Sequence, residues 1–151
     1  PLQLANYVAT LVSGGEHYAA HLLKSVKSYD NSRLIYNYDE KPLNDMNISD
    51  STMAAVTKGM HDLTHDSLTS AFSRCMVEAG AKTGSAQVGT DIANGVFVAY
   101  APYDDPEIAV AIVVEKGGSG SLLANAAVDI INAWFSRGSS SVTTGENTLL
   151  Q

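Results

Sequence analysis

The sequence Ala81-Lys82-Thr83-Gly84-Ser85-Ala86-Gln87 is the starting point for predicting this fold. It places one cation and two hydroxyl groups around a glycine and runs into the small apolar residue Ala86. The pattern predicts a short strand that carries polar side chains. A tripeptide alone is weak evidence, because average residue usage produces Lys-Thr-Gly by chance in roughly a few per cent of chains of this size. The role of Lys82 therefore depends on the elements around it.

The residues after this sequence predict a sheet. Apolar runs separated by turn signals indicate strands at 81–88, 95–101 and 108–115. The segment 102–106 has a proline at each end and is typical of a compact turn between the second and third strands. The run 108–114 is apolar without alternation, so we expect both faces of that strand to be covered.

Apolar residues at helical spacing predict one helix at the start of the chain and another in its middle. The first helix covers 1–13 and is ended by Gly14-Gly15. The second begins at a cap formed by Ser49 or Asp50. Its apolar stripe consists of Met53, Val56, Met60 and Leu63. The segment 64–73 is small and polar, so we expect a loop or an irregular strand there.

A hairpin is expected between these two helices. The runs 22–26 and 34–38 are typical of extended chain on either side of the turn signal Asp30-Asn31. Apolar and polar residues alternate in the second run, which predicts a half-buried strand. The segment 41–47 is expected to be a loop.

The glycine-rich segment 117–120 is followed by a strongly apolar helix. Its apolar residues form two adjacent rows, which predict that the helix packs on a sheet. The first row consists of Leu122, Ala126, Ile130 and Trp134, and the second of Leu123, Ala127 and Ile131. We expect Trp134 to lie in the core. Residues 136–151 lose this periodicity, so we expect a flexible tail outside a folded unit over 1–135.

Length and composition limit the class of protein. With 151 residues, 45% of them hydrophobic, the chain can bury one ordinary core, which predicts one domain. The formal charge of -7 argues against nucleic acid or an anionic membrane surface as a partner. A single cysteine, Cys75, excludes an internal disulfide and a cysteine-based metal site. Pro1 suits the first position inside a helix but lacks a capping residue before it, so we expect the chain to be part of a longer one.

Four segments resemble one family in their order and spacing. Lys-Thr-Gly is the third of three motifs that mark serine penicillin-binding proteins and class A β-lactamases. The segment 1–26 resembles the chain that follows the second motif, Ser-x-Asn, in class B penicillin-binding proteins. The segment 80–87 resembles their third motif, and 94–102 and 107–110 resemble the two strands after it. The similarity runs from Pro1 to about residue 135.

This resemblance implies an α+β fold, an antiparallel sheet flanked by helices, of the penicillin-binding/β-lactamase-like transpeptidase type. The family has a five-stranded sheet, of which this C-terminal part holds the last three strands and the last helix. In the family the strand matching 108–115 pairs with a strand from the N-terminal part of the same domain. We therefore expect an unpaired edge on this strand, covered by the missing N-terminal part or by self-association.

The resemblance also implies serine acyl transfer on a D-Ala-D-Ala stem peptide or on a β-lactam. Lys82, Thr83, Gly84 and Ser85 would bind the substrate. Lys82 and Ser85 would also act in catalysis, Ser85 through its backbone N–H as an oxyanion donor. Gly84 would allow the substrate backbone to approach closely. Many members have Gly at the position of Ala81 and Thr at that of Ser85, but Ser85 keeps the hydroxyl and the N–H.

The nucleophile is not found in this sequence. No serine has a lysine three residues later or an asparagine two residues later, so we expect the nucleophile, its lysine and the second motif upstream of Pro1. The chain alone should be inert. We expect its parent to be a peptidoglycan D,D-transpeptidase on the extracytoplasmic face of the bacterial membrane. A β-lactamase or β-lactam sensor of the same fold and a non-catalytic scaffold are the alternatives.

Histidines and glycines elsewhere predict no further site. His17 and His21, like His61 and His65, have a spacing that places two imidazoles on one helix face. No third ligand is evident from the sequence, so we interpret them as exposed histidines at helix ends and expect no metal and no cofactor. The segment 117–120 lacks the Lys-Ser/Thr of a phosphate-binding loop and is better explained as a turn from strand to helix.

Overall fold

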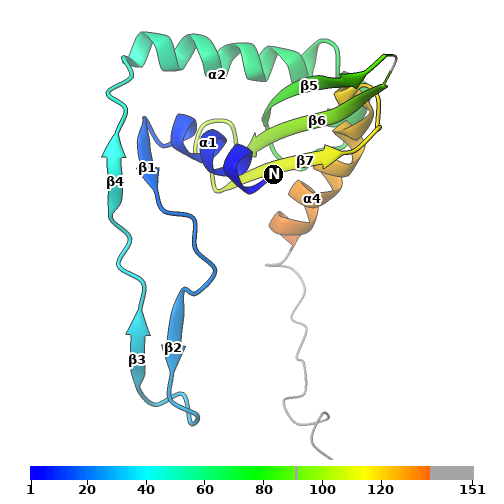
Figure 1. Cartoon of the computed structure of the whole chain (residues 1–151). Coiled ribbons are helices and arrows are strands. Elements are labelled where there is room, and N and C mark those ends of the chain that lie inside the picture. Colours follow the sequence, from blue (N-terminus) through cyan, green and yellow to red (C-terminus); the bar gives the residue numbers. More distant parts are fainter. Residues whose placement is uncertain (91, 137–151) are drawn as a thin grey trace, which may run out of the picture.

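Three antiparallel strands form the central sheet of the computed structural model, which describes residues 1–90 and 92–136 (Figure 1). They are β5 (Gly80–Gly89), β6 (Ile92–Ala101) and β7 (Ile108–Val114), with β6 in the middle. The register pairs Lys82 with Val98 across β5 and β6. All three strands predicted from the sequence are confirmed, and within the described residues β7 pairs with β6 alone, as expected for an open edge.

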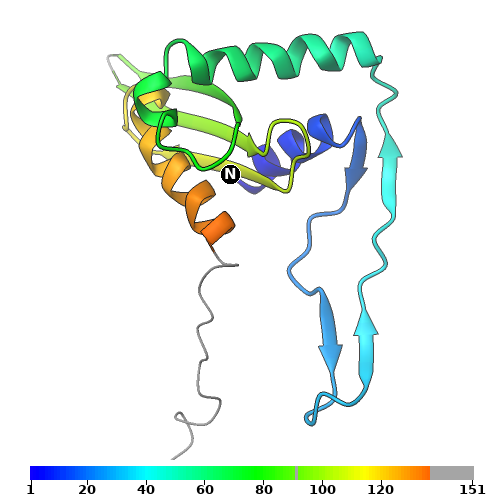
Figure 2. The same cartoon turned by 180° about the vertical axis from the view of Figure 1, so that it is seen from behind.

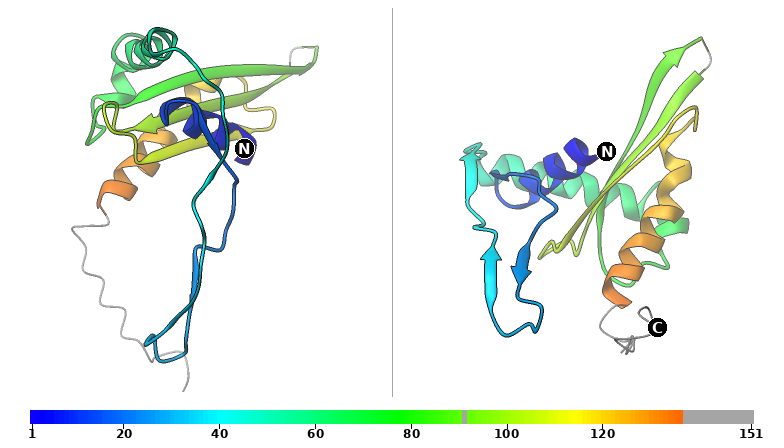
Figure 3. Two further views of the ribbon diagram at one scale, coloured as in Figure 1. Left: turned by 90° about the vertical axis from the view of Figure 1, so that its left-hand side faces the viewer. Right: turned by 60° about the horizontal axis from the view of Figure 1, so that its bottom comes forward.

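Helices cover both faces of this sheet (Figure 3). On one side lie α1 (Leu2–Val12) and α2 (Asp50–His65), and on the other lies α4 (Ala124–Ser136), which follows the short 3₁₀ helix η1 (Gly120–Leu123). As predicted, α2 is capped by Ser49, whose hydroxyl accepts a hydrogen bond from the Thr52 backbone N–H at 3.3 Å. No helix in the described part of the chain is long and apolar enough to span a membrane.

The core has one cluster on each face. Between the sheet and α4, the fully buried residues include Phe97 and Ala99 from β6 and Val128 and Ile131 from α4. On the other face, Val8 of α1 and Met60 of α2 enclose the buried ring of Tyr100. Hydrophobic burial on both faces fixes the position of β6, the strand that aligns β5.

The segment 64–73 consists mostly of helix, with a turn at 66–68, rather than the predicted loop or irregular strand. Its first two residues complete α2, and α3 (Thr69–Phe72) follows. Leu68, Ala71 and Phe72 are buried in the core at helical spacing, and the ring of Phe72 stacks on Phe97 at a centroid distance of 6.4 Å. The prediction was wrong because only three apolar residues mark this helical spacing and most of their neighbours are polar.

A long arm connects the end of α1 to the start of α2 and extends away from the central sheet (Figures 1 and 2). It contains two antiparallel strand pairs. The pair near the helices joins β1 (Glu16–Tyr18) to β4 (Pro42–Asp45), and the pair near the tip joins β2 (Ser25–Lys27) to β3 (Leu34–Asn37). The predicted hairpin is confirmed. The prediction of a loop over 41–47 is wrong, because the chain returns beside β1 and forms β4.

The arm packs on little else, so β3 is exposed along its whole length instead of half-buried. The ring of Tyr38 finds cover within the arm, where it stacks on His21 at 3.5 Å. At the base of the arm, the Asn6 side chain of α1 donates to the Tyr18 carbonyl at 3.2 Å. The alternation in sequence was real, but the arm offers no second layer to cover one face of the strand.

The two apolar rows of the last helix have different environments. Ala127 and Ile131 are fully buried against the sheet. The other row faces outward: Leu122 is 72% exposed and Trp134 39% exposed. The expectation that Trp134 lies in the core is therefore wrong for this chain. Ser136 ends α4, and the rest of the predicted tail, 137–151, lies outside the described residues.

Candidate active-site strand

The Lys-Thr-Gly motif lies on β5, which is an edge strand. Within the described residues β5 pairs only with β6, so alternate backbone N–H and C=O groups face away from the sheet. Such an edge can bind an extended peptide through main-chain hydrogen bonds. The strand that carries the candidate residues is thus open along one side.

The pleat of β5 sends neighbouring side chains to opposite faces of the sheet. Ala81 is fully buried in the cluster that faces α4, and alternation places Thr83 and Ser85 on that same face. Lys82 lies on the other face, where it lines a cavity of about 380 Å³ between α1 and α2. Thr83 is half-buried, whereas Lys82 and Ser85 are exposed.

Lys82 is held without an acidic partner. Its Nζ donates to the Thr83 carbonyl at 2.6 Å. No carboxylate of the described residues forms an ion pair with this ammonium, whereas Lys58 pairs with Asp62 at 2.6 Å. The cavity around Lys82 is mainly apolar, with Val8, Met60 and others on its walls. A ligand carboxylate therefore meets a positive charge that the protein has not already neutralised.

The hydroxyls of Thr83 and Ser85 are available to a ligand. Within residues 1–90 and 92–136 neither side chain makes a hydrogen bond to the protein. Each hydroxyl can donate one hydrogen bond and accept others. The strand thus carries one cation and two hydroxyls within four residues along an open edge, with the Lys82 cation on one face of the sheet and the hydroxyls of Thr83 and Ser85 on the other.

Gly84 and Gly120 differ in whether the surrounding structure leaves room for a side chain. A Cβ added to Gly84 would meet the Val96 side chain at 3.4 Å, an ordinary contact, so packing within the chain does not require glycine there. Its proposed role in substrate approach stays a prediction. A Cβ on Gly120 would lie 2.1 Å from the Val96 carbonyl oxygen and 2.4 Å from that of Gly84. The start of η1 thus rests directly on the backbone of the motif.

Sequence reasoning treated Gly120 only as part of a turn and missed this contact. The signal was present in the sequence as Gly95, which pairs with Ser85 in the register. A Cβ on Gly95 would meet Leu123 and the carbonyls of the glycine-rich turn at 3.4–3.6 Å. Small residues on both sides of this contact allow η1 to lie close to the strands.

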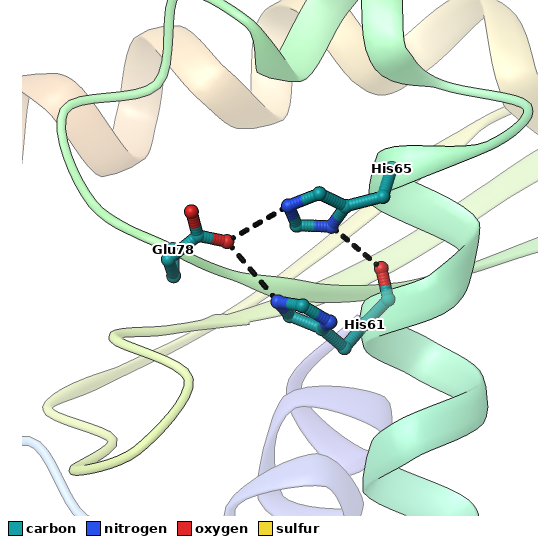
Figure 4. A group of neighbouring side chains, drawn as sticks. All are labelled: His61, His65 and Glu78. Atoms are coloured by element: carbon teal, nitrogen blue, oxygen red, sulfur yellow. Dashed lines mark hydrogen bonds and ion pairs between the residues drawn. The ribbon is translucent and has the colours of Figure 1, made fainter.

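The two histidine pairs lie in different parts of the structure. His17 lies in β1, with its Nε2 3.0 Å from the Asn6 side-chain nitrogen, and His21 lies in the arm, so neither is at a helix end as interpreted. His61 and His65 do lie at the end of α2, and the structure adds Glu78 as a third potential ligand (Figure 4). Sequence reasoning missed Glu78, which is 13 residues from His65 in the chain.

The fold and this strand together define the class of protein. The chain belongs to the family of the penicillin binding protein transpeptidase domain, whose model matches residues 1–132. The α+β transpeptidase fold is confirmed by solved structures of the family. Over 89% of this chain and 24% of the other, the structure is similar to that of penicillin-binding protein 2B from Streptococcus pneumoniae, with a TM-score of 0.76 and 32% identity.

Particular relatives are similar along most of the chain. In sequence, penicillin-binding protein 2B of S. pneumoniae is 34% identical over 152 residues, which cover 89% of this chain and 22% of the relative. Peptidoglycan D,D-transpeptidase MrdA of Acinetobacter baumannii is 26% identical, with the same coverage. The imipenem acyl-enzyme complex of penicillin-binding protein A from M. tuberculosis matches with a TM-score of 0.78 and 27% identity, over 89% of this chain and 30% of that one. The chain spans about a fifth of the length of these curated relatives.

Proposed function

We propose that this chain is the C-terminal part of a peptidoglycan D,D-transpeptidase, and that β5 forms one wall of its active site. Lys82, Thr83 and Ser85 bind the terminal carboxylate of a D-Ala-D-Ala stem peptide or the carboxylate of a β-lactam. The backbone N–H of Ser85 donates to the oxyanion of the tetrahedral intermediate. The serine nucleophile and its lysine come from a preceding segment, because this sequence contains no Ser-x-x-Lys.

The observation that carries this proposal is the placement of an unpaired lysine and two free hydroxyls on an open strand edge. The sheet and η1 fix the backbone of the strand, so the backbone N–H groups along its open edge are held in place before a ligand binds. Preorganised donors are the main source of catalysis in acyl transfer. The names of the relatives favour a transpeptidase over a β-lactamase.

The partners and location follow from the same proposal. The chain acts with the N-terminal part of its own domain, which covers the open edge of β7 and the exposed row of α4. When that part is missing, β7 supports self-association, since an unpaired apolar strand readily pairs with another copy. The intact protein works at the extracytoplasmic face of the bacterial membrane, where peptidoglycan is cross-linked.

The test is labelling of the full-length protein with fluorescent penicillin. Lys82→Ala should lower the rate constant of acylation by roughly 10- to 100-fold, because a hydrogen bond to a charged group contributes about 1.5–3 kcal/mol. Ser85→Ala keeps the backbone N–H and loses only a neutral hydroxyl, so a fall of about 2- to 10-fold is expected. Lys27→Ala, which removes an exposed strand lysine from the arm, is the matched control and should label like the wild type.

Equal labelling of Lys82→Ala and the wild type would remove Lys82 from the site. The 151-residue chain alone should not label. A label that is released quickly would identify a β-lactamase instead, because a transpeptidase holds its acyl-enzyme. A full-length protein that lacks Ser-x-x-Lys and never labels would be a scaffold.

A further inference from the structure

Two imidazoles and a carboxylate converge where α2 meets the start of β5 (Figure 4). Glu78 Oε2 lies 3.1 Å from His61 Nε2 and 3.0 Å from His65 Nε2. The ligand atoms of these three residues all lie within 4.8 Å of one another. A histidine pair one helical turn apart with a carboxylate opposite is a donor set for a transition metal.

The distances match those that a bound ion requires. Zinc bonds to histidine nitrogen and carboxylate oxygen are about 2.0–2.2 Å long, so tetrahedral ligand atoms lie roughly 3.3 Å apart. The two nitrogen–oxygen distances of this cluster are only a few tenths of an ångström shorter. All three ligand atoms lie within 4.8 Å of one another, so an ion placed among them can be reached from each side chain.

The backbone that carries the ligands is fixed by other contacts. Thr64, buried between the two histidines on α2, donates its hydroxyl to the Ala79 carbonyl at 3.1 Å. The Glu78 carbonyl accepts from the Tyr103 backbone N–H at 2.9 Å, and the ring of Tyr103 lies against His61 at 4.2 Å. The donors are therefore brought together by packing before any ion binds, which lowers the entropic cost of binding.

The second nitrogen of His65 also favours an ion. Its Nδ1 lies 3.2 Å from the His61 carbonyl, the partner that orients many metal-binding histidines through a hydrogen bond. The Thr64 hydroxyl lies 3.1 Å from the same Nδ1, so this nitrogen donates to the carbonyl or accepts from the hydroxyl according to the tautomer. In the tautomer with the proton on Nδ1, Nε2 has a lone pair that faces Glu78 and can bind a cation.

We propose that His61, His65 and Glu78 form a binding site for a divalent transition-metal ion, with Zn²⁺ as the ion that fits best. Two neutral histidines and one carboxylate give the three protein ligands, and the fourth position faces solvent, because the Glu78 side chain is 63% exposed and that of His65 51%. A hollow of about 340 Å³ beside His65 and Glu78 leaves room for a water molecule or an outside ligand.

The ion would link α2 to the strand of the Lys-Thr-Gly motif. Glu78 lies four residues before Lys82, so an ion shared with α2 holds the beginning of β5 against that helix. This site is separate from the proposed carboxylate site, and metal binding can be measured whether or not the chain belongs to a transpeptidase. Failure of one proposal therefore leaves the other unaffected.

The test is titration of the metal-free 151-residue chain with Zn²⁺ in competition with a chromophoric chelator. We expect one ion per chain and an increase in the thermal midpoint of unfolding, since an ion that binds the folded state stabilises it. His65→Ala and Glu78→Gln should each weaken binding at least tenfold, because even outer-shell changes cost 10–100-fold. His21→Ala, a histidine in the arm, is the matched control and should bind like the wild type.

Co²⁺ supplies a signature that nonspecific binding does not give. Coordination by this set should produce visible absorption bands of a low-coordinate Co²⁺ ion, and Glu78→Gln should remove them. Glu78→Gln keeps the size of the side chain, so it decides the question even if His65→Ala fails to fold by circular dichroism. The proposal is overturned if the wild type does not bind Zn²⁺, or if the folded Glu78→Gln variant binds it as tightly.

Discussion

Replacement of Gly120 by alanine tests whether η1 supports the motif strand. The new Cβ would lie 2.1 Å from the Val96 carbonyl oxygen and 2.4 Å from that of Gly84, whereas a real Cβ essentially never approaches a heavy atom within 3.0 Å. Both obstacles are backbone atoms in the middle of a sheet, so no side chain can rotate away. Either η1 or the β5–β6 pair must move by roughly 1 Å, and overpacking of this kind costs about 1–3 kcal/mol.

The measurement is urea denaturation of the 151-residue chain followed by circular dichroism. Gly59→Ala is the matched control, because Gly59 lies within α2 with nothing within 4 Å of an added Cβ. That change should stabilise the chain by about 0.5–1 kcal/mol through helix propensity. In the full-length protein, Gly120→Ala should also slow acylation by penicillin, since Gly84 moves with the strand. A Gly120→Ala variant as stable as Gly59→Ala would show that η1 does not rest on the backbone of β5 and β6.

Two further substitutions test the core. Phe97→Ala removes a fully buried ring, so the free energy of unfolding in urea should fall by about 3–5 kcal/mol; a loss under about 1 kcal/mol would contradict the packing. Tyr100→Phe removes a buried hydroxyl that has no hydrogen-bond partner among the described residues. Burial raises the pKa of Tyr100 from 10.0 to about 12, so its neutral form stabilises the fold below pH 10 and this contribution is lost as the pH rises to 12. Wild-type stability should fall more steeply over this window than that of Tyr100→Phe, and equal slopes would count against the burial effect.

The strands and long helices could be predicted because local patterns determine them. The apolar runs around Lys82 have turn signals at their ends, and Ser49 marks the start of α2 by its capping chemistry. The order of these elements identified the family and, through it, the open edge of β7. For the candidate site, Lys82, Thr83 and Ser85 could be named from the sequence because the motif is continuous, and their roles stay predictions.

The predictions that were wrong or missing depend on contacts between elements that are far apart in the sequence. The rows containing Trp134 and Ile131 are equally apolar in sequence, and only the position of the sheet decides that Ile131 is buried. The contact of Gly120 with Gly84 joins residues 36 positions apart. Glu78 reaches His61 because the chain through α3 turns back beside α2. Periodicity describes a single element and does not contain this information.

The exposed arm formed by β1–β4 has a consequence for how the sequence can change over evolution. Each of its strands is hydrogen-bonded to another strand of the arm and to none of the central sheet. Residues can therefore be gained or lost at its tip, near Asn31, without a shift in the register that aligns Lys82 with Val98. The length and surface of this arm can therefore change without disturbing the strand that carries the motif.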